Sequence, residues 1–374
     1  MTGFIPVNEP VLDGNEKRYL AECIDSGWIS SEGPFVREFE SRFAARVGRK
    51  HGIAVCNGSA ALDLGAAALR LGPGDEVIMP TFTIISCAAA ITRLGATPVL
   101  VDCDAATWNM NVRDIEARIG PKTKAIMVVH LYGLPVDMDP VADIAQRHGL
   151  MIIEDAAEMI GQTYRGKPCG SFGELSTFSF YPNKHVTTGE GGMVVTDDDA
   201  LAKRCRSLRN LAFEPPPARR FVHEELGWNF RMTNLQAAVG LAQLERIDEF
   251  IARKRHSLAR YMELLAGVEG LQLPVTCTDF ADNINWVFGV VLADSVPFDA
   301  EVAMKKLADL GIGTRPFFWP MHEQPVYARA GLFAGERHPN AERIARRGFY
   351  LPSGLGLTDE QMIRVAEAVR RILA

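Results

Sequence analysis

STFSFYPNKHVTTGEGGMVVT, residues 176 to 196, is the stretch that decides the fold. A strand-like run leads to Lys184, and a glycine-rich turn and a second strand-like run follow it. A lysine is usually a solvated surface residue, but here the apolar flanks would bury an ammonium group, which is costly without a partner. Bonding of the amine to an aldehyde as a Schiff base removes that cost, and burial lowers the pKa of the amine so that it can act as a nucleophile. The pattern therefore favours a buried, reactive lysine.

Strand-like and helical segments alternate on the N-terminal side of this stretch. The sequence predicts strands at residues 76–80, 97–102, 124–130 and 150–155, with helices near 86–94 and 140–148. Strands buried on both faces and separated by helices indicate an α/β fold with a mostly parallel sheet flanked by helices. Right-handed crossovers place the loops after the strands along one edge of the sheet, where ligands usually bind.

The C-terminal part has a different pattern. Three prolines at 215–217 cannot continue a helix or a central strand, so we expect an exposed loop there. A helical pattern runs from Thr233 to about Leu265, and the remainder mixes a strand-like run at 286–292 with helices near 299–310 and 358–373. We expect a large domain over residues 1–248 and a smaller α+β domain over 249–374, with the boundary inside the long helix.

The bulk composition excludes several classes of protein. The chain has 374 residues and a net charge of −6, which gives no positive field to favour nucleic acid or an anionic membrane. Its seven cysteines are scattered, and Cys-x-x-Cys and His-Glu-x-x-His motifs are absent, so we expect no disulfide scaffold, no metal site and a cytoplasmic setting. We also expect no signal peptide and no membrane span, because the longest apolar stretch, 84–101, contains Arg93, Gly95 and Pro98.

Three acidic residues, Glu154, Asp155 and Glu158, follow the apolar run at residues 150–153. Asp155 ends the predicted strand, and such a residue is often only a helix N-cap. A carboxylate at the ligand edge of the sheet is also what pyridoxal phosphate requires, because it keeps the pyridine nitrogen protonated and lets the ring accept electrons. Glu158 would face the same site if a helix begins here.

A third motif, CNGSAALDL at residues 56–64, joins a turn to an Ala/Leu-rich helix. The free N–H groups and the dipole of a helix start suit a phosphate dianion. A simple helix cap would explain the motif equally well on its own. Together with Lys184 and Asp155, the phosphate site is the favoured interpretation.

Five motifs carry a resemblance to a known family: NGSAAL at residues 57–62, PTFT at 80–83, HLYG at 130–133, EDAAE at 154–158 and SFYPNK at 179–184. In this combination the chain resembles the DegT/DnrJ-type sugar aminotransferases, which have the aspartate-aminotransferase fold, known as fold type I. The resemblance covers nearly the whole chain, from Pro6 to Ser353. It implies pyridoxal 5'-phosphate as the cofactor.

The resemblance also assigns roles to individual residues. It implies that Lys184 forms the Schiff base and moves protons, and that Asp155 contacts the pyridinium nitrogen. The resemblance also implies that Ser59, Ala60 and Ser179 contact the phosphate of the cofactor. Ile84 occupies the position that covers the cofactor ring, where many relatives have an aromatic residue. Glu158 occupies a position that contacts the 3-hydroxyl region of the cofactor or the incoming sugar.

A shared segment, GWNFRMTNLQA at residues 227–237, implies a homodimer with shared active sites. In the family, the residue at the position of Asn229 reaches the phosphate of the partner's cofactor, and such an interface suits C2 symmetry. Arg231 is either catalytic or structural. The resemblance places three residues near the sugar, His185, Trp319 and His322, although His322 is equally well explained as a packed surface histidine.

The reaction implied by the resemblance has two halves. L-glutamate gives its amino group to the cofactor, and a keto-sugar then takes it. Two acceptors fit, GDP-4-keto-6-deoxy-mannose and a 3-deoxy-octulosonate-type keto acid aminated at C8, and both serve lipopolysaccharide or O-antigen synthesis. Relatives that dehydrate sugars have histidine in place of the lysine, so Lys184 favours amino transfer. A nucleotide-sugar dehydrogenase or epimerase would need a Gly-x-Gly-x-x-Gly turn, which is absent.

Overall fold

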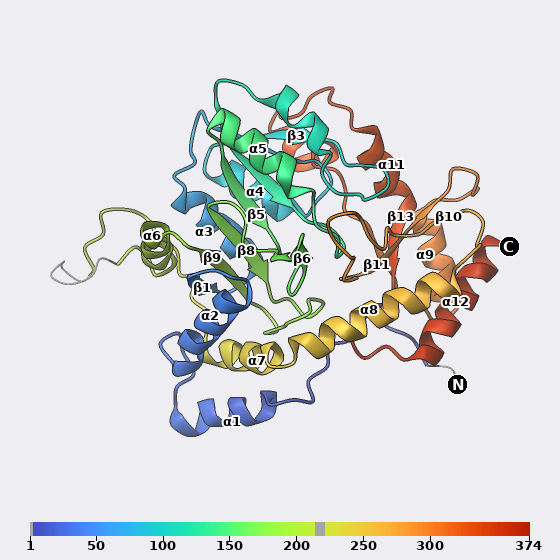
Figure 1. The fold of residues 1–374 in the computed structure, drawn as a ribbon, viewed down its shortest axis with the longest axis horizontal. Helices are drawn as coiled ribbons and strands as arrows, with labels where there is room; N and C mark the ends of the chain where they lie inside the picture. The colour runs from blue at the N-terminus through green and yellow to red at the C-terminus, as the bar shows by residue number, and fades with distance from the viewer. Residues whose placement is uncertain (1–2, 214–220) are drawn as a thin grey trace.

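A seven-stranded sheet forms the centre of the molecule (Figure 1). The computed structural model describes residues 3–213 and 221–374, so the loop expected at the three prolines lies outside the described residues. The order of the strands across the sheet is β1 (His51–Val55), β9 (Gly192–Thr196), β8 (Leu175–Ser179), β5 (Met151–Asp155), β4 (Thr123–Val129), β2 (Glu76–Pro80) and β3 (Thr97–Val101). Strand β9 runs antiparallel to β1 and β8, and the other neighbours are parallel. The predicted α/β fold with a mostly parallel sheet is confirmed.

Helices cover both faces of this sheet. One layer contains α3 (Gly58–Ala68), α4 (Ile85–Arg93) and α6 (Asp199–Arg209), and the other contains α2 (Pro34–Arg46), α5 (Met138–His148) and α7 (Asn234–Leu244). Helix α1 (Glu16–Ser26) packs against α7. Neighbouring strand residues point to opposite layers, as Ile152 and Ile153 do. This two-sided burial explains why the strands appear as continuous apolar runs, and the four predicted N-terminal ones agree with the structure to within one residue at each end.

The long helix predicted from Thr233 begins where expected but is not continuous. The Thr233 hydroxyl accepts a hydrogen bond from the Gln236 amide at 3.2 Å, and the Gln236 side chain accepts one from the Thr233 amide at 3.0 Å. The chain then leaves the helical conformation at Arg246 (φ −112°) and continues as α8 (Ile247–Leu264). Helix α7 packs on α1 and α2, whereas α8 packs on α12 (Asp359–Leu373). The break lies where the chain passes from one set of packing partners to the other (Figure 1).

A smaller antiparallel sheet lies in the C-terminal part. Its strand order is β10 (Leu271–Gln272), β11 (Phe288–Leu292), β13 (Gly348–Leu351) and β12 (Arg315–Pro316). The remaining elements there are α9 (Ala300–Asp309), α10 (Pro325–Arg329) and α11 (Pro339–Arg347), while a short hairpin of β6 (Thr163–Tyr164) and β7 (Lys167–Pro168) follows β5. Ile5 packs in the apolar cluster of the small sheet, and its amide donates to Gly311 O at 2.9 Å. The division at residues 248 and 249 stays a prediction, and Ile5 crosses it.

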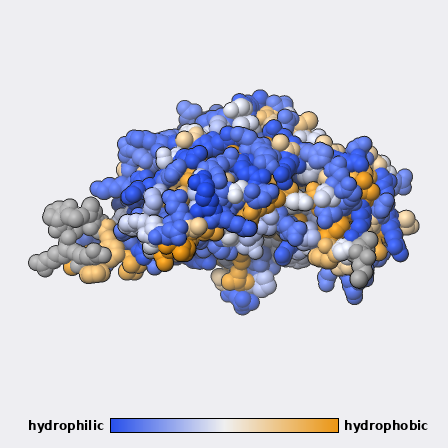
Figure 2. Space-filling model, turned by 90° about the horizontal axis from the view of Figure 1, so that it is seen from below, coloured by the Kyte–Doolittle hydropathy of each residue, from blue (hydrophilic) through white to orange (hydrophobic). Residues whose placement is uncertain are grey.

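The composition predicts neither a membrane span nor a disulfide scaffold, and the helices and cysteines of the structure can be compared with both predictions. Within residues 3–213 and 221–374, no helix is both long and apolar enough to cross a membrane. On the face shown in Figure 2, hydrophilic residues predominate and apolar residues form separate patches. All seven cysteines are unpaired. The fold described here is therefore held together without a disulfide.

Candidate active site

A cavity of about 460 Å³ opens beside the carboxyl ends of β5 and β8. Its lining comes from four parts of the chain: Asn57, Gly58, Ser59 and Leu62; Ile84 and Ser86; Asp155 and Ala157; and Thr177, Phe178, Ser179, Tyr181, Lys184 and Glu190. The crossovers of the large sheet bring these segments to one edge. The cavity thus unites the three motifs that the sequence singles out.

Lys184 lies in the turn after β8, and its side chain is only 10% exposed. Its Nζ is 3.9 Å from Glu158 Oε1 and 3.8 Å from the centre of the Trp286 ring. Burial lowers the pKa of this amine, and the carboxylates of Glu158 and Asp155 oppose that shift. The amine is therefore easier to deprotonate than a surface lysine, as a nucleophile requires.

Asp155 is the last residue of β5 and is buried. Its Oδ1 accepts a hydrogen bond from the Ala157 amide at 3.0 Å, and its Oδ2 accepts one from Cys87 Sγ at 3.2 Å. Burial raises the pKa of this carboxyl, and the Ala157 amide, the Cys87 thiol and the positive charge of Lys184 act against that increase. A turn follows Asp155 in place of a helix, so the N-cap interpretation does not apply.

Glu158 reaches the site through this turn, so the helix considered for residues after Asp155 does not form. Its Oε2 accepts a hydrogen bond from the Tyr132 amide at 2.6 Å. Burial raises the pKa of Glu158 to about 8, against the opposing effects of Lys184 and the Tyr132 amide. A carboxyl with this pKa holds its proton at neutral pH and can donate a hydrogen bond.

The start of α3 forms the opposite end of the cavity. Asn57 caps this helix, because its Oδ1 accepts a hydrogen bond from the Ala60 amide at 2.8 Å. Ala60, a predicted phosphate contact, therefore already has an acceptor for its amide, and it is not among the lining residues. In the described part of the chain, the amides of Gly58 and Ser59 have no such acceptor and adjoin the cavity. Ser59 Oγ lies 2.7 Å from Ser86 Oγ.

The residues present fit pyridoxal phosphate. A Cβ added at Gly58 would lie 2.7 Å from Ser179 Cβ, so glycine keeps this end of the cavity open. Thr177 lines the cavity, and its buried Oγ1 has no hydrogen-bond partner within the described residues. A phosphate at the helix start, a ring under Ile84 and a ring nitrogen at Asp155 would use these groups.

Four residues expected near the substrate or the partner do not line this cavity, and their roles stay predictions. His185 is fully buried, burial lowers its pKa to about 3, and it does not line the cavity. His322 bonds to Thr81 Oγ1 at 2.8 Å and is also outside the lining, as is the exposed Trp319. Asn229 is exposed and forms a β-bridge with Asn210 outside the cavity.

Arg231 donates a hydrogen bond to Asn210 Oδ1, which favours its structural role. Sequence reasoning missed Ser86, Cys87, Tyr181 and Trp286 at the site. Only Tyr181 carried a local signal, because it lies inside the decisive stretch at residues 176–196.

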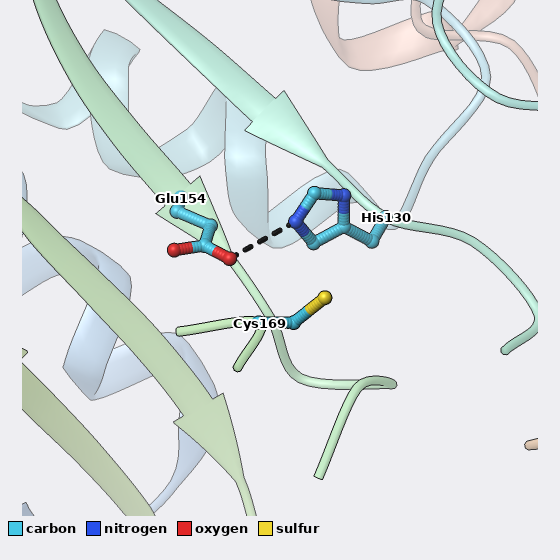
Figure 3. A group of neighbouring side chains, drawn as sticks. All are labelled: His130, Glu154 and Cys169. Carbon is cyan, nitrogen blue, oxygen red and sulfur yellow. Dashed lines mark hydrogen bonds and ion pairs between the residues drawn. The ribbon is translucent and has the colours of Figure 1, made fainter. Parts of the chain in front are cut away.

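Figure 3 shows a second polar group, formed by His130, Glu154 and Cys169. These side chains offer atoms within 4.8 Å of one another, as a metal site would. Glu154, however, accepts hydrogen bonds from four donors: His130 Nε2 at 3.0 Å, the Gly170 amide at 2.6 Å, the Phe172 amide at 2.9 Å and Ser176 Oγ at 2.7 Å. Because the Val136 amide donates to His130 Nδ1, the imidazole proton is on Nε2. The group anchors β5 beside Asp155.

The family of the chain follows from comparison with known proteins. Residues 10–370 match the DegT/DnrJ/EryC1/StrS aminotransferase family. The chain is 46% identical over 369 residues to the GDP-perosamine synthase of Caulobacter vibrioides, covering 99% of this chain and 98% of the relative. Its fold matches S. venezuelae DesV in complex with a ketimine intermediate, with a TM-score of 0.91 and 36% identity over 100% of this chain and 99% of the other. The PLP form of the Streptococcus pneumoniae protein Spr1654 matches with a TM-score of 0.91 and 26% identity over 99% and 98%. The chain therefore belongs to the DegT/DnrJ/EryC1/StrS family of pyridoxal-phosphate-dependent sugar aminotransferases.

Proposed function

We propose that the chain moves the amino group of L-glutamate to GDP-4-keto-6-deoxy-mannose, which yields GDP-perosamine. The observation that carries the reaction type is that Lys184 and Asp155 line one cavity and that Glu158 Oε1 lies 3.9 Å from Lys184 Nζ. The choice of sugar is supported by the 46% identity to a GDP-perosamine synthase over almost the full length of both chains.

Each of the three groups has a separate task. Pyridoxal phosphate, when bound, supplies the aldehyde carbon and an electron-accepting ring. Lys184 would hold this cofactor through its amine and, as a free amine, would carry a proton to and from the reacting carbon. Asp155, whose pKa is raised by burial, would hold the proton on the ring nitrogen, and that positive charge would favour the ionised carboxylate. Glu158 donates its proton in a hydrogen bond to the cofactor's 3-hydroxyl region or to the sugar.

The remaining contacts of the phosphate come from the start of α3. The amides of Gly58 and Ser59 and the hydroxyls of Ser59 and Ser179 supply donors to its oxygens. Lys184 is the one cation among the described residues that line the cavity. The phosphate and the carboxylates of glutamate consequently need further positive or polar groups from outside this lining.

A second copy of the chain can supply such groups, and we assign that role to Asn229 of the partner in a homodimer. Large apolar side chains that are exposed around the cavity support this arrangement: Ile84, Ile85 and Tyr181. A protein surface that exposes neighbouring apolar side chains is a candidate for an interface. Closure by a second copy would also exclude water from the reacting carbon.

A spectral half-reaction tests the proposed function. The enzyme is converted to its pyridoxamine form with L-glutamate, freed of glutamate and offered one keto-sugar at a time. Return of the original absorbance with GDP-4-keto-6-deoxy-mannose supports the proposal. Return only with an 8-keto octulosonate moves the enzyme to that substrate, and failure of glutamate to change the spectrum refutes glutamate-dependent amino transfer.

Two variants test the assigned residues in the same assay. Lys184→Ala should fold, bind the cofactor only noncovalently and lose turnover. Asp155→Asn should lose at least about tenfold in rate, because an amide no longer holds the ring nitrogen protonated. Retained turnover in Lys184→Ala, or a normal rate in Asp155→Asn, would reject the respective role.

A further inference from the structure

Trp286 comes from the C-terminal part of the chain but reaches the turn that carries Lys184. It precedes β11 and is buried, with only 4% of its surface exposed. Its indole Nε1 donates a hydrogen bond to Asn183 O at 2.8 Å. The face of its ring lies 3.8 Å from Lys184 Nζ. One side chain therefore contacts both the backbone beside the lysine and the amine itself.

The backbone around Trp286 is fixed from two sides. Lys254 Nζ, buried in α8, donates to Trp286 O at 2.8 Å and to Ser353 O at 2.5 Å. The backbone at Trp286 also packs closely against Gly133. A Cβ added at Gly133 would lie 2.7 Å from the Trp286 amide nitrogen. The neighbouring Asn285 has a φ of +57°, a conformation that costs energy for a residue with a side chain. Such a constrained approach holds the indole in one place.

The indole is also connected to Glu158 through Tyr132. The Tyr132 ring stacks on Trp286 at 6.0 Å with an interplanar angle of 11°, and the Tyr132 amide donates to Glu158 at 2.6 Å. Two groups that face Lys184 Nζ, a carboxyl and an aromatic face, are thus held together.

We propose that Trp286 is a positioning residue that holds the Lys184 turn through its N–H and stabilises the ammonium form of Lys184 through its ring. This inference rests on the proposed role of Lys184 as the amine that bonds the cofactor. A cation over the face of an aromatic ring is attracted by the ring's electrons, and tryptophan is the strongest of the three aromatic residues in this respect. The ring therefore acts against the burial that favours the neutral amine.

Other charged or titratable groups around this amine are the same in all variants of Trp286. Asp155 at the end of β5, Glu158 in the turn after it and Cys87 in α4 face Lys184, and each favours the ammonium form when it is ionised. Lys254 lies behind the indole and is coupled to Lys184 by repulsion between the two positive charges. A change confined to the indole consequently reports the contribution of the ring and its N–H.

The test is the pH dependence with which the full-length enzyme, stripped of cofactor, recaptures pyridoxal phosphate in absorbance measurements. The recapture rate follows the fraction of neutral Lys184 amine. In Trp286→Leu, loss of the ring should shift the ammonium-to-amine ratio by about 2- to 30-fold, which lowers the pH midpoint by about 0.4 to 1.5 units. Trp286→Phe should shift the midpoint in the same direction by less, and it should release bound cofactor faster because the bond to Asn183 O is lost. If Trp286→Leu does not fold, Trp286→Phe alone decides.

Phe298→Leu is the matched control, because it removes a ring that lies 3.9 Å from Lys306 Nζ outside the cavity. It should leave the midpoint unchanged. The same midpoint in wild type and Trp286→Phe or Trp286→Leu overturns the inference while the proposed function stands. Absence of covalent capture in wild type, with a spectrum equal to that of Lys184→Ala, overturns the proposed function and the inference together.

Discussion

Replacement of Glu158 by glutamine separates the two protonation states of this residue. With a pKa of about 8, the protonated fraction of Glu158 falls about tenfold between pH 7 and pH 9. Because Oε2 accepts the Tyr132 amide, the proton belongs on Oε1, the oxygen that lies 3.9 Å from Lys184 Nζ. The amide of a glutamine donates from the same position at every pH. Glu158→Gln should therefore resemble the wild type at pH 7 and differ from it at pH 9.

The assay is the half-reaction with saturating L-glutamate, followed by stopped-flow absorbance from pH 6 to pH 9.5. The ratio of wild-type to Glu158→Gln rate constants removes the titrations that both proteins share. This ratio should fall about tenfold between pH 7 and pH 9, with its midpoint near the pKa of about 8. Glu190→Gln, which changes an exposed carboxylate of the same cavity, should show a constant ratio.

A constant ratio for Glu158→Gln across this range would refute the reasoning, because the proton on Glu158 would then have no part in the step. A ratio that rises with pH would show that the ionised carboxylate is the active form. A fall in the Glu190→Gln ratio would assign the titration to another group of the cavity.

Two further predictions concern binding and stability. Gly58→Ala should weaken cofactor binding by about 5- to 150-fold, because the added Cβ lies 2.7 Å from Ser179 Cβ. Gly72→Ala, whose Cβ meets no atom closer than 4.0 Å, should bind normally in the same fluorescence titration. Burial lowers the pKa of Lys254 in the folded state to about 7. Above pH 7 the unfolded chain keeps this proton and the folded chain loses it, so the free energy of unfolding rises with pH. Urea titrations of the wild type and of Lys254→Met measure this effect. The free energy of unfolding of the wild type, relative to that of Lys254→Met, should rise by about 2 kcal/mol between pH 7 and pH 9. If the difference between the two proteins stays the same over this range, Lys254 keeps its charge in the folded state.

Local sequence patterns predict the large sheet well because its strands are buried on both faces. The run at residues 76–80 is reproduced as β2 without change, since a continuous apolar segment between turns has few alternatives. The turn after Asp155 is a different case, because helical spacing alone suggested a helix up to Glu158. There the Asp155 side chain accepts the Ala157 amide, and the chain leaves the strand through a turn.

Which side chains reach the site depends on contacts between distant segments, and local sequence patterns do not indicate such contacts. His185 follows Lys184 directly, yet it is fully buried and outside the cavity lining. Cys87 and Trp286 contact the site from far along the chain, 68 residues from Asp155 in the case of Cys87. No periodicity or spacing near either residue marks it as part of a site, because its role depends on the packing of another element.

The electrostatics of the cavity also link cofactor binding to the stability of the fold. Burial shifts the pKa of Lys184 downward and those of Asp155 and Glu158 upward, so all three groups are moved toward their neutral forms. A cofactor with a protonated ring nitrogen supplies the positive charge that lets Asp155 ionise, and bonding to the aldehyde removes the need to bury a lysine ammonium. Bound cofactor would therefore offset the unfavourable burial of these groups, and a ligand that binds only the folded state stabilises that state. The same arrangement that prepares the amine for reaction thus ties the stability of this part of the fold to the bound cofactor.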